Sequence, residues 1–169
     1  MGNGSRAGGV GVSRPSLKDE IKKRNPFDCP EQEAALNLAR TADRLQVQGA
    51  RMLKAYGLTG GQYNVLRILR GAGTELTCQE VGSRTIAQVP DITRLVDRLE
   101  AAGLVERRRP PEDRRVVLLR ITDRGLALLA ELDEPILALH RRQLGHLTRD
   151  ELDELNRLLV KARQPDGDA

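Results

Sequence analysis

Six arginines lie within one segment of seventeen residues, and their side chains are suited to contacts with phosphate. Segment 104–120 contains three carboxylates and the arginines Arg107, Arg108, Arg109, Arg114, Arg115 and Arg120. A planar guanidinium can donate two parallel hydrogen bonds to a phosphate, and it can also enter a narrow minor groove. The alternative is a charged edge strand that resists aggregation, an interpretation that suits Arg107 and Arg108.

A second set of candidate residues lies on a predicted helix over 89–103, with Pro90 in its first turn and Gly103 at its end. One face of this helix is apolar at helical spacing, through Ile92, Leu95, Val96 and Leu99. The opposite face is polar and carries Asp91, Thr93, Arg94, Asp97 and Arg98. An α-helix fits the major groove of DNA, so the polar face is a candidate for base contacts.

Three side chains near the start of this helix match groups on base edges. Arg94 could donate two bonds to guanine, Asp91 could accept one from cytosine, and Thr93 could contact a thymine methyl group. Pro90 and Arg98 complete the candidate DNA-binding residues of the helix. The alternative is an ordinary amphipathic surface helix, stabilised by ion pairs between side chains four residues apart.

The elements around these residues predict a DNA-binding lobe over 59–124. Thr77 begins a short helix, with Glu80 three residues later as its capping-box partner. Thr77 and Arg84 border this helix and are candidate phosphate contacts. Two β-rich runs flank the turn PPED at 110–113 and predict a hairpin. A short helix, a turn, a second helix and a basic hairpin are typical of a winged helix-turn-helix.

The remaining sequence predicts long helices rich in leucine. A helix of about 25 residues should begin at Pro30 and end near Gly57. Thr59, Thr122 and Thr148 should cap three more helices, and Pro135 should kink or break the one that follows Thr122. The predicted fold class is therefore mainly α with a small β-hairpin wing. It comprises a winged helix-turn-helix lobe plus a helical dimerisation region formed by 30–57 and 125–163.

The composition and the first residues of the sequence argue against several classes of protein. No uninterrupted apolar run approaches the roughly 18 residues of a membrane span, and the first residues lack the apolar stretch of a signal peptide. Two cysteines are too few for a disulfide framework, which is typical of a protein in the reducing cytoplasm. Together with the lack of apolar runs, this predicts a cytoplasmic protein without a membrane partner. Residues 1–26 carry the whole net charge of +4, and their glycines predict a disordered basic tail ahead of a domain over 27–169.

Three motifs resemble the MarR family of bacterial transcription regulators: LTGGQYNVLRILRGAG, DITRLVDRLEAAGLVERR and PPEDRRVVLLRITDRG. The resemblance covers about residues 34–162. It implies an obligate homodimer that binds a pseudo-palindromic operator in double-stranded DNA. We therefore expect a ligand-responsive repressor. It also implies that Arg115 contacts DNA and that Asp113 braces it. Arg114 is a candidate second phosphate contact.

The same resemblance implies a small-molecule effector, often a phenolic or other lipophilic anion, held between the dimerisation helices and the winged lobe. Arg40, Arg44 and Tyr63 are the polar candidates for this site. A winged-helix module that binds protein instead of DNA is the alternative from another class. A thiol-based redox regulator of the same family is a further alternative, with Cys29 as its candidate residue.

No residues support an enzyme, a metal site or a cofactor. His140 and His146 have no cysteine or second histidine at metal-binding spacing. No glycine-rich phosphate loop follows a predicted strand. The sequence therefore predicts a DNA-binding regulator with no catalytic residues, no metal and no cofactor.

Overall fold

The computed structural model describes residues 15–88, 90–111, 113 and 115–164. The chain divides into two compact units, with the boundary after Gln46. The first contains α1 (Leu17–Glu20) and the first part of α2 (Pro30–Lys54). The helix α2 begins at Pro30. The negative charges of Glu31 and Glu33 in its first turn interact favourably with the positive end of the helix dipole and stabilise the helix. The predicted long helix is confirmed, at 25 residues.

The structure differs from the predicted disordered tail at residues 17–20. Ser16 caps α1 by accepting a hydrogen bond from the Asp19 amide, and the Asp19 carboxylate accepts one from the Ser16 amide. Leu17 is buried. A reciprocal capping box thus stabilises one helical turn inside a segment whose composition predicts disorder. Residues 1–14 of the predicted tail lie outside the described residues.

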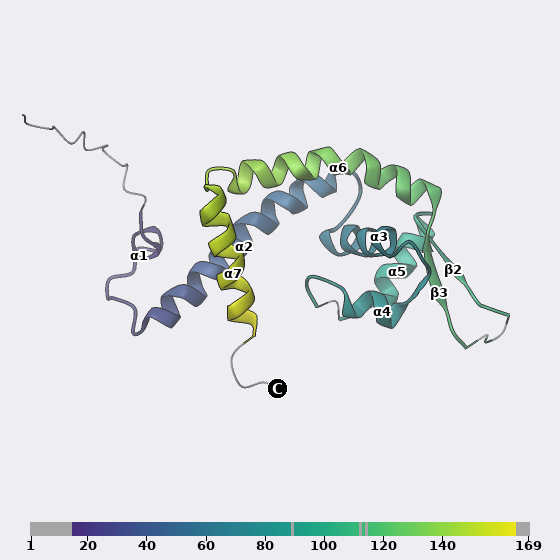
Figure 1. Ribbon diagram of the computed structural model, residues 1–169, viewed down its shortest axis with the longest axis horizontal. Coiled ribbons are helices and arrows are strands. Elements are labelled where there is room, and N and C mark those ends of the chain that lie inside the picture. The colour runs from purple at the N-terminus through teal and green to yellow at the C-terminus, as the bar shows by residue number, and fades with distance from the viewer. Residues whose placement is uncertain (1–14, 89, 112, 114, 165–169) are drawn as a thin grey trace, which may run out of the picture. The chain divides into compact units, whose positions relative to one another are not determined.

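The second unit holds the remaining elements, and Figure 1 shows the helices α3, α4 and α5 beside a hairpin that projects from them. In chain order they are α3 (Gly60–Ala72), β1 (Leu76–Thr77), α4 (Cys78–Ser83), α5 (Ile92–Ala101), β2 (Val105–Arg108), β3 (Leu118–Ile121), α6 (Asp123–Leu144) and α7 (Arg149–Arg163). The fold is therefore mainly α with a small antiparallel sheet, as the sequence predicts.

The hairpin belongs to a sheet of three antiparallel strands in the order β1-β3-β2. Val105 pairs with Ile121 at the base of the hairpin, and Arg108 pairs with Leu118 toward its tip. The short strand β1 was not expected from the sequence, because two residues are too few to show an alternating pattern. It joins the start of α4 to the wing through β3.

One apolar core connects the three short helices, the sheet and α6. Its fully buried side chains are Val65, Leu66, Leu69, Val81, Val96, Leu99, Val105, Leu119, Leu129 and Leu132. Val96 and Leu99 belong to the apolar stripe predicted on α5, and Ile92 and Leu95 of that stripe are half-buried against the same core. Burial of this stripe fixes which face of α5 is left exposed.

The helix α6 continues through Pro135 as an unbroken helix of 22 residues, which Figure 1 shows as gently arched. A proline removes one backbone hydrogen bond and crowds the preceding turn, so a break was one of the expected outcomes. Leu132 and Ile136 are buried on either side of the proline. Their packing offsets the lost hydrogen bond and holds the helix together. No helix within the described residues is long and apolar enough to cross a membrane.

Candidate nucleic-acid interface

Asp91 caps the N-terminus of α5, which begins at Ile92, three residues after the start of the predicted helix over 89–103. Asp91 is the N-cap, and its carboxylate oxygen Oδ1 accepts a hydrogen bond of 2.8 Å from the backbone amide of Arg94. Pro90 lies in the turn before the cap, so it is not in the first helical turn as expected. An aspartate cap satisfies an otherwise unpaired amide, and this local bond outweighs the helix-starting preference of proline. Asp91 therefore has a structural role, and its base contact stays a prediction.

The exposed face of α5 presents two arginines one turn apart. Thr93, Arg94 and Arg98 are all exposed, on the side away from the buried Val96 and Leu99. Among the residues that the structure describes, the side chains of Arg94 and Arg98 make no hydrogen bond or ion pair. Two guanidinium groups with unused donors on one helix face form a surface suited to polyanions.

The tip of the wing is organised by Asp113. Its carboxylate accepts a hydrogen bond of 2.9 Å from the backbone amide of Arg115, and its carbonyl oxygen accepts one from Val116 at 3.2 Å. Asp113 and Arg115 are exposed. The Arg115 side chain makes no hydrogen bond or ion pair with any described residue. Arg114, the second predicted wing contact, lies outside the described residues.

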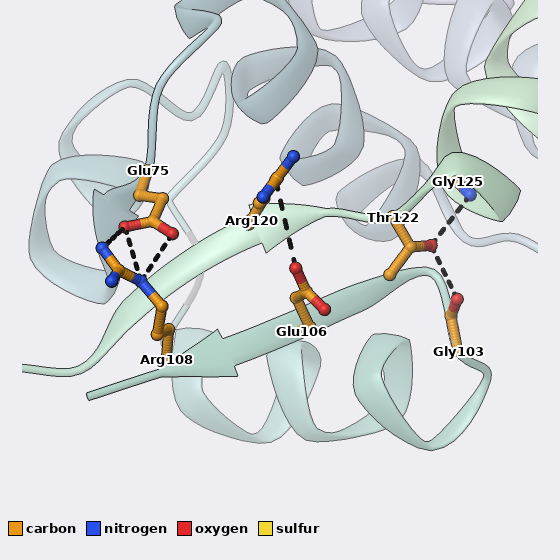
Figure 2. Close-up of polar contacts among 7 residues, drawn as sticks. All are labelled: Glu75, Gly103, Glu106, Arg108, Arg120, Thr122 and Gly125. Carbon is orange, nitrogen blue, oxygen red and sulfur yellow. Dashed lines mark hydrogen bonds and ion pairs between the residues drawn. The ribbon is translucent and has the colours of Figure 1, made fainter. Parts of the chain in front are cut away.

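The base of the wing uses its arginines differently, because they pair with carboxylates. Arg107 of β2 reaches Asp97 and Glu100 of α5. Arg108 donates to both oxygens of Glu75, at distances between 2.6 and 3.1 Å (Figure 2). The hydrogen bonds from Arg108 lower the pKa of Glu75. Arg107 and Arg108 therefore have structural partners, which differ from the solvated edge strand that was the alternative considered from the sequence.

Figure 2 also shows how the hairpin is joined to its neighbours. Arg120 and Glu106 are partners across β3 and β2, with 4.0 Å between Arg120 Nε and Glu106 Oε1. The hydroxyl of Thr122 donates to the carbonyl of Gly103 at 2.8 Å and accepts from the amide of Gly125 at 3.1 Å. The same threonine thus caps α6 and holds the loop after α5, which anchors the base of the wing.

The predicted phosphate contacts at α4 are placed at its two ends. Thr77 is the N-cap in a capping box, and its hydroxyl donates to Glu80 Oε2 at 2.8 Å. A hydroxyl has one proton, so this bond leaves Thr77 none to donate to a phosphate in this arrangement. Arg84 is the C-cap residue, and it is exposed. The role of Arg84 as a phosphate contact stays a prediction.

The candidate effector residues belong to different units of the chain. Arg40 and Arg44 both pair with Glu20, at 2.7 and 2.9 Å, so one carboxylate is shared between two positive charges. Tyr63 lies in the second unit and lines an open groove of about 680 Å³ between α3 and α6. Its hydroxyl accepts a hydrogen bond of 3.4 Å from Arg67, which also lines the groove.

The cysteines and histidines form no metal centre in the part of the chain that the structure describes. Cys29 is exposed and donates its thiol proton toward Glu31, whose pKa is lowered first by a backbone hydrogen bond and then by Cys29. Cys78 packs half-buried against the core, and burial raises the pKa of its thiol. A raised pKa keeps Cys78 protonated and unreactive at neutral pH.

The contact of Arg107 with α5 was missed by sequence reasoning. Asp97 and Glu100 are visible as acidic residues on the outward face of the predicted helix, and Arg107 follows them on the predicted strand. The closeness of these three charged residues in the sequence is the one signal of their contact that the sequence offers. The register of the strand against the helix decides whether these residues meet, and it follows from tertiary packing.

Comparisons with known proteins agree with this geometry. The model of the MarR family matches residues 56–116, which extend from before α3 to the tip of the wing. The HTH-type transcriptional repressor IacR of Pseudomonas putida is 35% identical over 122 residues, covering 72% of this chain and 72% of that protein.

Two solved structures are also similar. The MarR transcription factor from Planctomyces limnophilus is 46% identical, with a TM-score of 0.62, and the match covers 80% of this chain and 98% of that one. BpsR of Bordetella bronchiseptica, whose DNA binding is regulated by 6-hydroxynicotinic acid, is 27% identical with a TM-score of 0.72. That match covers 84% of this chain and 100% of BpsR.

Proposed function

The chain belongs to the MarR family of DNA-binding transcription regulators, and from this premise we propose that it is a ligand-responsive, homodimeric repressor. Its operator is a pseudo-palindromic site in double-stranded DNA. Such a protein binds its operator in the cytoplasm and leaves it when an effector binds. It needs no cofactor for this activity.

The observation that carries the proposal is the division of the arginines into two sets. Arg107 and Arg108, at the base of the wing, are paired with carboxylates. Arg94 and Arg98 of α5 and Arg115 of the wing are exposed, and their side chains have no partner among the described residues. These three arginines lie on the elements that the winged-helix geometry directs toward DNA.

Each element has its own role in the proposed complex. The start of α5 enters the major groove, where Arg94 bonds a guanine and Thr93 contacts a thymine methyl group. Arg98 lies one turn further along α5 and bonds the phosphate backbone. The wing places Arg115 against the backbone or in the adjacent minor groove, and Arg84 adds a phosphate contact from the end of α4.

Dimerisation is supported by apolar side chains that the described residues leave uncovered. None of the residues of α7 is buried, and Leu158 and Val160 are nearly half exposed. Leu36, Leu38 and Val47 of α2 are similarly exposed. Apolar surface on two helices, both outside the winged lobe, is typical of an interface between copies of a chain.

The regulatory part of the proposal is supported by the relatives. IacR is a repressor, and the DNA binding of BpsR responds to an aromatic acid. In this chain the groove lined by Tyr63, Arg67 and Leu137 offers apolar walls and an arginine, which lies 3.6 Å from Asp133 of the same groove. We propose that it contributes to binding a small lipophilic anion. Arg40 and Arg44 contribute only if Glu20 releases them.

A binding-sequence selection from random duplexes tests the proposed function. The expected result is a motif with two related half-sites, whose centres are about one helical turn apart or a multiple of that distance. Binding should weaken steeply as the salt concentration rises, because phosphate contacts release counterions. A protein-interaction module would select no motif, and its binding would not follow this salt dependence.

A second experiment tests the effector. Small phenolic and other lipophilic anions are added to the complex with the selected duplex, and release is followed by fluorescence anisotropy. At least one compound should lower the affinity for the duplex, and Tyr63→Ala should reduce its effect. If no compound of this class releases the DNA, the proposed effector chemistry is wrong and the DNA-binding function stands.

A further inference from the structure

Arg107 occupies the face of β2 that is directed toward α5. Side chains alternate along a strand, so Arg107 shares its face with the buried Val105, while Glu106 and Arg108 lie on the other face. Val105 enters the core, and α5 packs against β2. The longer Arg107 side chain extends past the edge of this packing and remains 24% exposed.

The guanidinium of Arg107 meets three acceptors spread over two turns of α5. Its Nη2 donates to Asp97 Oδ1 at 2.6 Å and lies 3.5 Å from the carbonyl oxygen of Thr93. Its Nη1 donates to Glu100 Oε2. One strand side chain is therefore fixed to Thr93, Asp97 and Glu100, and Thr93 is itself a candidate base contact.

We propose that Arg107 is a positioning residue for DNA recognition, which holds the wing and α5 in one fixed arrangement. This inference rests on the proposed binding of a specific DNA sequence. With Arg107 in place, Thr93 and Arg94 reach base edges while Arg115 reaches the backbone, so that both sets of contacts form together. Binding of two elements is stronger when their relative position is set before they meet the ligand.

Two other roles for Arg107 predict different behaviour. An arginine that bonds phosphate directly would contribute to every DNA sequence alike and would increase the salt dependence. An arginine that only neutralises Asp97 and Glu100 could be replaced by lysine. It would also become dispensable once the two carboxylates were removed. A positioning arginine needs its planar fork, because one ammonium group cannot hold the same set of acceptors in the same geometry.

The test compares affinities for two duplexes: the one obtained by selection with the wild-type protein, and a scrambled duplex of equal length and composition. The specificity ratio is the Kd for the scrambled duplex divided by the Kd for the selected duplex. Arg107→Gln should lower this ratio about tenfold, within the range expected for coupled contacts, with a smaller effect on the scrambled duplex. Arg107→Lys should recover part of the lost specificity and not all of it.

The double variant Asp97→Ala, Glu100→Ala gives the sharpest comparison, because its general affinity for DNA and its specificity ratio should change in opposite directions. It removes two negative charges from α5, so its affinity for the scrambled duplex should rise. Its specificity ratio should nevertheless fall, because Arg107 has lost its partners. Alanine favours helix, so this variant keeps α5 intact even where Arg107→Gln fails to fold.

Arg108→Gln is the matched control, since it removes the same charge from the next residue of β2 but on the face that pairs with Glu75. Its specificity ratio should stay within about twofold of wild type. The proposal is overturned if Arg107→Gln weakens both duplexes equally and lowers the salt slope, or if Arg107→Lys matches wild type. It is also overturned if the double variant tightens both duplexes without changing their ratio.

These outcomes are distinct from failure of the proposed function. If the wild-type protein prefers no sequence, specific DNA binding is refuted and the role of Arg107 with it. If the wild type discriminates between the duplexes and Arg107→Gln discriminates equally well, only the positioning role is refuted.

Discussion

Asp113 accepts a hydrogen bond of 2.9 Å from the backbone amide of Arg115 at the tip of the wing. An aspartate that bonds the amide two residues later forms an Asx turn, which fixes the main chain without using the side chain of the second residue. The guanidinium of Arg115 therefore stays available while its backbone is held. The family resemblance implies that Asp113 braces Arg115, and the contact that this structure has between them is with the main chain of Arg115.

Replacing Arg115 by alanine should weaken binding to the selected duplex and to unrelated DNA alike. The loss of one phosphate contact should reduce the slope of log affinity against log salt by about one per lobe. Thermal stability should change little, because the side chain is exposed and has no partner among the described residues. Titrations at four or five salt concentrations measure the slope.

Asp113→Asn is the matched control for this measurement. An amide oxygen can still accept the bond from the Arg115 amide, so this variant should keep the turn and bind DNA nearly as the wild type does. Asp113→Ala removes the acceptor and should weaken binding. An affinity and a slope for Arg115→Ala that equal the wild-type values would mean that Arg115 is only a surface charge.

Arg94→Ala should affect sequence preference more than general affinity. If Arg94 bonds a guanine through two hydrogen bonds, its loss should cost about 1–3 kcal/mol on the selected duplex and relax one position in each half-site. Binding to scrambled DNA should fall much less, since the backbone contacts remain. Selections with wild type and variant side by side check this. An even loss of affinity with an unchanged motif would show that Arg94 contacts phosphate.

The sequence predicts those parts of the fold that depend on residues close together in the chain. The capping boxes of Thr59, Thr77 and Thr148 were predicted and are all present. Each joins a threonine to the residue three positions later, so no distant contact is needed. The wing was predicted for a similar reason, because its two strands and turn are contiguous.

The parts that were missed depend on distant contacts or on competition between local signals. Arg107 meets α5 only because β2 packs against that helix in one register. Glu20 pairs with Arg40 and Arg44 of α2, which follow it in the sequence by 20 and 24 positions. At the start of α5, Pro90 and Asp91 both favour a helix beginning, and the hydrogen bond of the aspartate cap decides between them.

The protein should be a dimer with no stable folded monomer. The leucines predicted to form the interface include Leu152, Leu155, Leu158 and Leu159 of α7, a helix on which no residue is buried. Leucines that stay half-buried or exposed along one helix are typical of an interface. Sedimentation equilibrium at micromolar protein should give the mass of two chains, and unfolding should shift to higher temperature as concentration rises. A monomer mass that is independent of concentration would refute the dimer.

Gly125→Ala should destabilise the second unit. A Cβ at this position would collide with the carbonyl oxygen of Leu104 and would lie 2.7 Å from Ile121 Cγ1. Relieving that overlap requires a shift of α6 against the wing, which should lower the free energy of unfolding by about 1–3 kcal/mol. Urea unfolding of wild type and variant at equal protein concentration measures the difference.

Gly71→Ala in α3 is the control for Gly125→Ala, because a Cβ at Gly71 would meet nothing within 4 Å. Alanine has the higher helix propensity, so this variant should be stabilised by up to about 1 kcal/mol. A stable Gly125→Ala protein would show that the close approach of α6 to Leu104 is not a constraint on the fold.

The ion pair between α3 and α6 should make stability depend on pH in the acid range. Arg70 donates to both carboxylate oxygens of Asp133, at 2.7 and 2.9 Å, and Arg67 lies 3.6 Å away. The hydrogen bonds from Arg70 lower the pKa of Asp133 below its usual value of 3.8. A carboxyl with a lowered pKa in the folded state stabilises the fold above its unfolded pKa, and the contribution is lost as pH falls through the folded value.

Asp133→Asn should therefore be less stable than wild type at neutral pH, and the difference should shrink only once the pH falls below about 4. Urea unfolding at several pH values between 7 and 3 measures it. Glu134→Gln is the control on the same helix, because Glu134 pairs with Arg141 at an exposed surface where an ion pair contributes little. A stability difference for Asp133→Asn that stays constant down to pH 3, or grows as the pH falls, would mean that the charge of Asp133 does not stabilise the contact between α3 and α6.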